Sequence, residues 1–213
     1  PDERPLEVLP ARHCAHGGLL IDDQGRSSVP GLYAGGGEVA AGDHGADRLG
    51  GHMLASGQVF GSRAGRHAAQ FARSQAVSDL PPDVIDHGLE PIIRLREQQG
   101  SVPPKKLKRE IQQRMWETML VLRSAEGFQR VFQMLASVGK ETPPLLSIES
   151  PMQLVEALEI ENMLVVAEME SRAASLRTES RGSHSRMDFT QRDDTNWLKH
   201  SLAHRTPDGP QIE

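Results

Sequence analysis

The sequence has no complete G-x-G-x-x-G fingerprint after a strand, the glycine pattern that opens a dinucleotide site. Its single cysteine, Cys14, excludes an internal disulfide and fits a reducing compartment. The net charge of −5 argues against a general nucleic-acid binder, since such proteins need a basic surface. No apolar run approaches the roughly 18 residues of a membrane span, and no secretory signal is visible. We therefore expect no nucleic-acid partner, no direct membrane insertion and a cytoplasmic location.

The composition changes near residue 75, and this change predicts the domain organisation. Most glycines come before it, and long charged amphipathic segments follow. The 213 residues can form one large or two small domains with a real core. We expect a first domain segment over 1–75, a connector with one helix over 76–104, a three-helix antiparallel bundle over 105–178 and an irregular tail over 179–213. Because the chain begins at Pro1, within the approach to a strand, we expect a piece of a longer polypeptide.

In the first segment, short apolar runs alternate with glycine-rich turns. We expect a strand over 18–21 closed by a turn over 22–25, and a second buried strand over 32–34. Apolar residues recur at helical spacing between Met53 and Arg73. Small residues along this helix would let it lie close against a sheet.

The second part of the chain carries three apolar patterns of helical period, over 107–122, 128–138 and 150–174. The third has the clearest beginning, because Ser150 is a good N-cap and Gln153 stands where a capping box needs it. The short connections between the three favour an antiparallel bundle.

The loop from Gly35 to Gly37 and the helix after it have the composition of a cofactor site. A glycine loop lets the backbone approach a ligand closely, and the N-terminus of the next helix presents N–H groups that stabilise an anionic group. Glu38 could accept hydrogen bonds from a ribose hydroxyl. The plain alternative, which a lone G-G-G-E favours, is an ordinary turn with a solvated Glu38.

Arg48 precedes the same helix, where a guanidinium can grip a carboxylate through two hydrogen bonds. A structural salt bridge with Asp47 or Asp43 is an equal alternative for this arginine. We expect His13 to offer a hydrogen bond to a substrate oxygen. A metal site built on Cys14 and the nearby histidines is only weakly indicated, because no second ligand pair follows at zinc-site spacing. We therefore expect no metal.

Two charged clusters in the second part each allow a plain and a sharper interpretation. Cations between Lys105 and Arg109 crowd the start of one helix, the unfavourable end for positive charge, and form either a solvated face or a docking surface for an acidic partner. A second cluster surrounds Glu179, and we expect it to be an ion-pair network that pins the tail rather than a catalytic site. Its members are Arg177, Arg181, His184 and Arg186.

The segment from His13 to Ala69 resembles the end of the flavin-binding domain in the succinate dehydrogenase/fumarate reductase flavoprotein family. That family typically reads H-Y-x-x-G-G, V-x-G-L-x-A-x-G-E and H-G-A-N-R-L-G-x-N-S-L in this order. The second half is similar to the family's helical domain in its R-T-E-S-R-G-S-H and D-D-T-N-W-L-K-H stretches. The residues that match the three motifs are His13, Gly17–Gly18, Val29–Ala34, Gly37–Glu38, His44–Ala46 and Arg48–Gly50.

The resemblance implies an α+β chain in which a partial, Rossmann-like FAD-binding segment precedes a three-helix antiparallel bundle and an irregular tail. It implies that His13 and Arg48 hold the carboxylates of a dicarboxylate substrate. The family's proton-transferring arginine lies upstream, so no catalytic residue is expected in this chain. The positions implied at FAD are Glu38 at the adenosine ribose, Gly37 in the loop, and Met53 and Leu54 at the flavin pyrimidine edge.

For the activity, the resemblance implies interconversion of succinate and fumarate, or of a related dicarboxylate, by hydride transfer at flavin N5. Electrons would be exchanged with an iron–sulfur partner subunit, and partners would attach the protein to the inner face of the membrane. Because the family's ADP-binding fingerprint lies upstream, we expect the chain alone to bind FAD poorly and to be inactive. The alternative is a non-catalytic interaction module that docks a partner through its helical bundle.

Three positions depart from the family pattern and leave the substrate open. Asp47 stands where the family has asparagine and places a negative charge beside Arg48. His52-Met53 replace N-S, and Cys14 replaces the aromatic residue after the first histidine. The related aspartate oxidases share the first segment, whereas the N-W-L stretch of the tail fits the dehydrogenase/reductase branch better.

Overall fold

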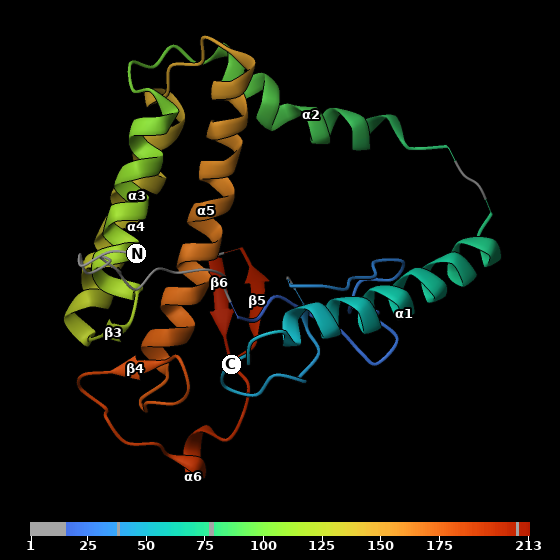
Figure 1. Ribbon diagram of the computed structural model, residues 1–213. Coiled ribbons are helices and arrows are strands. Elements are labelled where there is room, and N and C mark those ends of the chain that lie inside the picture. The colour runs from blue at the N-terminus through green and yellow to red at the C-terminus, as the bar shows by residue number, and fades with distance from the viewer. Residues whose placement is uncertain (1–15, 38, 77–78, 208) are drawn as a thin grey trace, which may run out of the picture. The chain divides into compact units, whose positions relative to one another are not determined.

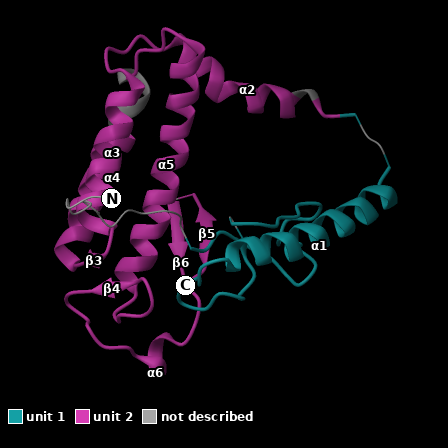
Figure 2. Ribbon diagram, viewed as in Figure 1, with its two compact units in different colours: residues 1–79 teal, residues 80–213 magenta. Residues whose placement is uncertain are grey.

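The structure is a computed structural model that describes residues 16–213 except 38, 77, 78 and 208, and only the backbone of 82 and 140–145. The chain forms two compact units, Pro1–Asp79 and Leu80–Glu213 (Figure 2). The division lies close to the change in composition near residue 75. Within the described residues, no helix is long and apolar enough to cross a membrane.

The first unit contains one small sheet, in which β1 (Leu19–Leu20) pairs in parallel with β2 (Val39–Ala40). The expected turn over 22–25 is present, because the Gly25 N–H donates to the Asp22 carbonyl at 3.0 Å. The strand expected over 32–34 is reduced to an isolated bridge between Tyr33 and Arg26. The run is short because Gly31, with a φ of 84°, turns the chain directly before it.

The helix expected between Met53 and Arg73 is α1 (His52–Ser74), and its small residues allow a close approach as predicted. A Cβ atom added to Gly35 would lie 2.6 Å from the backbone nitrogen of Gly61. One added to Gly25 would lie 2.6 Å from the Cβ atom of Ala64. The surface that approaches α1 is therefore the glycine-bearing loop around residues 25–35.

The second unit is built mainly from helices that follow one another along the chain (Figure 1). Of these, α3, α4 and α5 each contact the other two, and α2 contacts α5. Their bounds are α2 Pro82–Glu97, α3 Pro104–Met119, α4 Ala125–Leu145 and α5 Pro151–Leu176.

The core of the second unit shows how the helices run. Ile111, Val131 and Ile160, one from each of α3, α4 and α5, are completely buried in one cluster. In a second cluster Leu107, near the start of α3, packs with Leu146, directly after the end of α4. Since the start of α3 meets the end of α4, these two helices run in opposite directions, as in an antiparallel bundle.

Hydrogen bonds at the start of α5 confirm the capping prediction. The hydroxyl of Ser150 accepts from the Gln153 N–H at 3.3 Å, and the Gln153 side chain accepts from the Glu149 N–H at 2.6 Å. The reciprocal bond of a capping box thus reaches one residue further back than usual. Ser124 caps α4 in the same way, because its Oγ accepts from the Gly127 N–H at 3.1 Å.

Two parts of the second unit differ from expectation. The helix expected to reach Leu122 ends at Met119, and Leu122 belongs to β3 (Leu122–Arg123), which pairs in parallel with β4 (Ser185–Arg186). The tail expected to be irregular also contains short regular elements, since polar contacts rather than an apolar period hold it. They are α6 (Asp194–Trp197) and the antiparallel pair β5 (Ala203–Thr206) and β6 (Gly209–Ile212).

Candidate functional site

The glycine loop and the first turn of α1 lie together in the first unit. A Cβ atom added to Gly37 would lie 3.3 Å from the sulfur of Met53, so these two predicted cofactor residues are in contact. Met53 and Leu54 are 42% and 69% exposed. No side chain caps the start of α1. A backbone cradle, a helix N-terminus and an apolar rim therefore meet at one place, and they fit the edge of a flat cofactor.

Arg48 lies in the loop that leads into α1. Of its two acidic neighbours, Asp47 lies 3.6 Å from Nδ1 of His16, and Asp43 lies 3.7 Å from Nε2 of His44. Both carboxylates that the sequence offered as salt-bridge partners of the arginine are thus close to histidines. The structure places Arg48 near the start of the helix, as the sequence suggested, and its role in binding a carboxylate stays a prediction.

A pocket of about 260 Å³ lies beside the first two turns of α1. His44 Nδ1 and Ser56 Oγ are buried in the described part of the chain without a hydrogen-bond partner. The sequence suggested His44 as polar lining, but no pattern marked Ser56, since it is one of many small residues on this helix. The pocket is lined by Asp43, His44, His52, Ala55, Ser56, Val59 and Phe60.

Three residues singled out in the sequence lie outside the described residues, namely His13, Cys14 and Glu38. The roles predicted for His13 at the substrate and for Glu38 at the ribose of FAD therefore stay predictions. Among the residues that the structure describes, no group of three or more His, Cys, Asp or Glu side chains could hold a metal ion.

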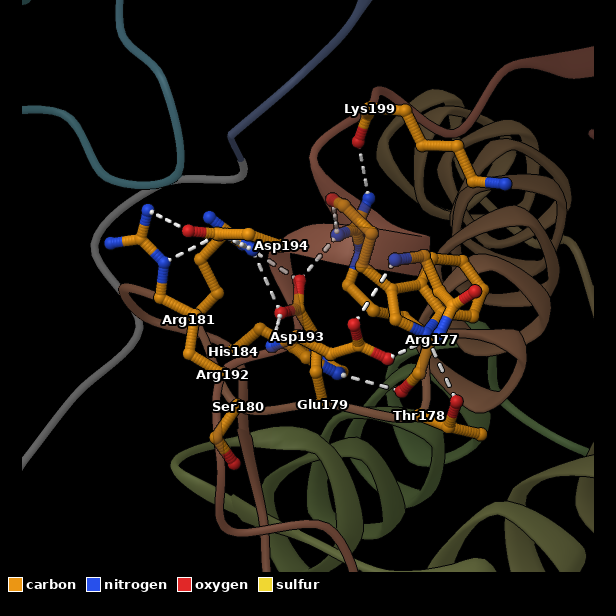
Figure 3. A network of polar contacts seen from close by, with 12 residues as sticks. Arg177, Thr178, Glu179, Ser180, Arg181, His184, Arg192, Asp193, Asp194 and Lys199 are labelled. Atoms are coloured by element: carbon orange, nitrogen blue, oxygen red, sulfur yellow. Dashed lines mark hydrogen bonds and ion pairs between the residues drawn. The ribbon is translucent and has the colours of Figure 1, made fainter.

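The cluster around Glu179 in the second unit is the ion-pair network that the sequence predicted (Figure 3). Glu179 is fully buried, and Arg177 and Arg181 each donate to its Oε1 at 2.7 Å. Its Oε2 accepts from Arg181 Nη2 at 2.9 Å and from the Asp193 N–H at 2.8 Å. The bond from Arg181 is the largest cause that lowers the pKa of Glu179 to about 2, against the opposing effect of burial.

The network holds the tail against the end of α5. Arg177 Nη1 and Nη2 donate to the carbonyls of Trp197 and Lys199 at 2.9 and 2.6 Å. The Arg177 guanidinium also lies 5.0 Å from the centre of a Trp197 ring, within the range of a cation–π contact. Asp193 caps α6 through N–H groups of Thr195 and Asn196, both at 3.0 Å. These contacts confirm a structural role for the cluster.

Arg186 has a structural role that sequence reasoning identified only as membership of the cluster. It is buried, and its Nη1 donates to three carbonyls at the end of α5 at 3.1–3.2 Å. Its Nε and Nη2 bind both oxygens of Asp188 at 2.7 Å, and this pairing is the main cause that lowers the pKa of Asp188 to about 2. Asp188 also accepts the Ala125 N–H at 3.0 Å. Arg186 and Asp188 therefore join the end of α5 to the start of α4.

His184 lies among these arginines as a neutral imidazole. Burial first, and then the charges of Arg123, Arg186 and Arg177, lower its pKa to about 4. Arg123 Nη1 lies 2.8 Å from Nδ1, and the Arg177 carbonyl lies 3.3 Å from Nε2. Because an arginine can only donate, Nδ1 accepts and Nε2 carries the proton.

The acids of α5 lie at the surface in ion pairs with α2 and α3. Arg94 Nη2 lies 2.7 Å from Oε1 of Glu161, and Lys108 pairs with Glu159. One member of the cationic cluster at the start of α3 thus has an acidic partner within the chain, which favours the plain interpretation for that residue.

Known proteins match both units. A fumarate reductase flavoprotein C-terminal model matches residues 108–213, and an FAD binding domain model matches residues 1–54. A fumarate reductase (CoM/CoB) flavoprotein relative from Methanothermobacter marburgensis is 38% identical over 192 residues, which cover 88% of this chain and 34% of the relative. L-aspartate oxidase of Streptomyces coelicolor is 35% identical over 216 residues, covering 98% and 36%.

Solved structures agree with these matches. The FrdA chain of E. coli quinol fumarate reductase superposes with a TM-score of 0.84 at 32% identity, covering 92% of this chain and 35% of that chain. The chain spans about a third of the length of the curated relatives it matches. The FAD binding domain match indicates FAD as the cofactor. The chain belongs to the succinate dehydrogenase/fumarate reductase flavoprotein family, as the end of its FAD-binding domain and its C-terminal helical domain.

Proposed function

We propose that the protein containing this segment interconverts succinate and fumarate, or a related dicarboxylate, with FAD as its cofactor. The observation that carries the proposal is the contact of Gly37 with Met53 at the start of α1, directly after the loop that bears Arg48. Helix N-termini stabilise negative charge, including that of a reduced flavin ring. When bound, FAD supplies the hydride acceptor or donor at N5.

In this proposal the residues of the chain bind and orient rather than perform the redox step. Arg48 holds one substrate carboxylate through two charge-assisted hydrogen bonds, and His13 binds the other. Two clamps on a small diacid fix the reacting carbon against the flavin, which is the positional contribution to catalysis. Glu38 binds the adenosine ribose, while Gly37, Met53 and Leu54 contact the flavin portion.

We further infer that an iron–sulfur partner subunit exchanges electrons with the protein, and that its partners attach the protein to the inner face of the membrane. Support comes from the family and from similarity to the FrdA chain of a quinol fumarate reductase. Since the chain spans about a third of its relatives, we expect the isolated chain to bind FAD poorly and to have no activity.

The similarity to an L-aspartate oxidase supports a second candidate substrate, L-aspartate. The two candidates differ in the α-amino group of the substrate and not in the carboxylates that Arg48 and His13 would bind. Assaying succinate, fumarate and L-aspartate with one enzyme preparation therefore separates them.

The test uses the full-length flavoprotein that carries this segment, loaded with FAD. Arg48→Ala should lower kcat/KM for the dicarboxylate about 10- to 100-fold, because one charged bidentate contact is lost, and should leave the flavin content unchanged. Arg66→Ala, an exposed arginine on α1, is the matched control and should behave as the unaltered protein. Equal kcat/KM in both variants would contradict the proposed role of Arg48.

A further inference from the structure

We propose that Asp47 and His16 form a charge-compensating pair that sets how tightly Arg48 holds a dicarboxylate. The inference rests on the proposed function, because it takes Arg48 as the residue that binds the substrate. Its structural basis is the 3.6 Å separation between Oδ1 of Asp47 and Nδ1 of His16, which come from two separate stretches of the first unit.

The charge of Asp47 is close enough to affect an anion held by Arg48. Consecutive Cα atoms are about 3.8 Å apart, so a carboxylate bound by Arg48 lies within about 10 Å of Asp47. The Asp47 side chain is 55% exposed, and water therefore screens the repulsion. At this separation and in a high dielectric, one uncompensated negative charge weakens binding of an anion roughly three- to tenfold.

His16 decides whether this repulsion is felt. Histidine is the side chain whose charge ordinarily changes between about pH 5 and 8. A protonated His16 offsets Asp47, whereas a neutral His16 leaves the carboxylate to repel the substrate. Dicarboxylate affinity should therefore fall as the pH rises, while turnover of bound substrate is unaffected.

The other titratable groups of this loop have contacts of their own. Asp43 lies 3.7 Å from His44, and the rings of His44 and His52 stack with centroids 6.4 Å apart. Arg48 keeps its positive charge over the whole range of pH. Within the described part of this loop, the pair of His16 and Asp47 is therefore the arrangement that can change the charge beside Arg48.

The experiment measures KM and kcat, and the affinity for the dicarboxylate by flavin absorbance, between about pH 6.5 and 8.5 in the full-length FAD-loaded protein. In the unaltered protein KM should rise three- to tenfold over this range with kcat constant. Asp47→Asn should give a low KM at every pH, and His16→Asn a high one. Asp23→Asn removes an exposed carboxylate of the same unit and should keep the original profile.

The double variant adds a direct test of coupling. If the two residues act as a pair, His16→Asn should have no effect on KM once Asp47 is replaced by asparagine. An Asp47→Asn variant that keeps the original rise of KM with pH would overturn the inference, even where Arg48→Ala abolishes binding. If Arg48→Ala leaves the affinity unchanged, the proposed function fails as well, so the two failures are distinguishable.

Discussion

Arg181 binds Glu179 through both arms of its guanidinium, with Nε 2.7 Å from Oε1 and Nη2 2.9 Å from Oε2. Glu179 is completely buried, and a buried carboxylate keeps its charge only when it is paired and hydrogen-bonded. The attachment of the tail to the second unit therefore depends strongly on this one carboxylate.

Replacing Glu179 by glutamine should lower the free energy of unfolding of the second unit by about 2–4 kcal/mol, because two largely buried arginines lose their anion. Chemical denaturation followed by circular dichroism measures the change. The control is Glu117→Gln, in an exposed pair 3.6 Å from Arg114, which should cost at most about 0.5 kcal/mol. Equal losses in the two variants would contradict the assignment of Glu179 as the centre of the network.

The same carboxylate makes the second unit sensitive to acid. The pKa of Glu179 falls from an ordinary 4.5 to about 2 in the folded protein, chiefly through the bond from Arg181. A lowered carboxyl pKa contributes stability that is present above the unfolded value and is lost as the pH falls through the folded value. The denaturation midpoint should therefore drop between about pH 5 and 2, and less steeply in Glu179→Gln.

His184 should produce a separate loss of stability at a higher pH. Burial and the surrounding arginines lower its pKa from 6.5 to about 4, so the folded state favours the neutral ring. Its contribution is complete above about pH 6.5 and is lost as the pH falls toward 4, amounting to about 2–3 kcal/mol. Denaturation midpoints at pH 7 and 5 measure this loss. His184→Gln should remove most of the difference, and an unchanged difference would show that other groups cause it.

Arg186 should not tolerate replacement by lysine, although the charge is conserved. Lysine cannot bind both oxygens of Asp188 and three helix carbonyls at once, because it lacks the planar fork of five donors. We expect Arg186→Lys to destabilise the second unit by at least about 2 kcal/mol. Arg192→Lys, at an exposed pair with Asp194, should change the unfolding midpoint little.

In the first unit, Gly35 and Gly65 should respond in opposite directions to alanine. A Cβ atom at Gly35 would lie 2.6 Å from the Gly61 nitrogen, so Gly35→Ala must push the loop away from α1. Gly65 lies within α1 with nothing within 4 Å of an added Cβ, so Gly65→Ala should stabilise the helix by about 0.5–1 kcal/mol. The flavin content and melting temperature of the full-length protein should fall only in the Gly35 variant.

The sequence predicted best the features whose partners lie within a few residues. The cap at Ser150, the helix between Met53 and Arg73 and the network around Glu179 all rest on such local spacing. The predictions that changed involved longer-range partners. Leu122 fitted a helical period but pairs in β3 with Ser185, because a strand is decided by its neighbour as well as by its own residues.

By itself, the sequence determined which half carries the glycines, where the main helices begin and which charges gather, because helix capping, apolar periodicity and local clusters act over short distances. Only the tertiary structure decided that Asp47 meets His16, that Arg186 closes the end of α5 and that Ser56 lines a pocket. Each of these arrangements joins separate segments, and no local pattern specifies their partners because the path and packing of the intervening chain bring them together.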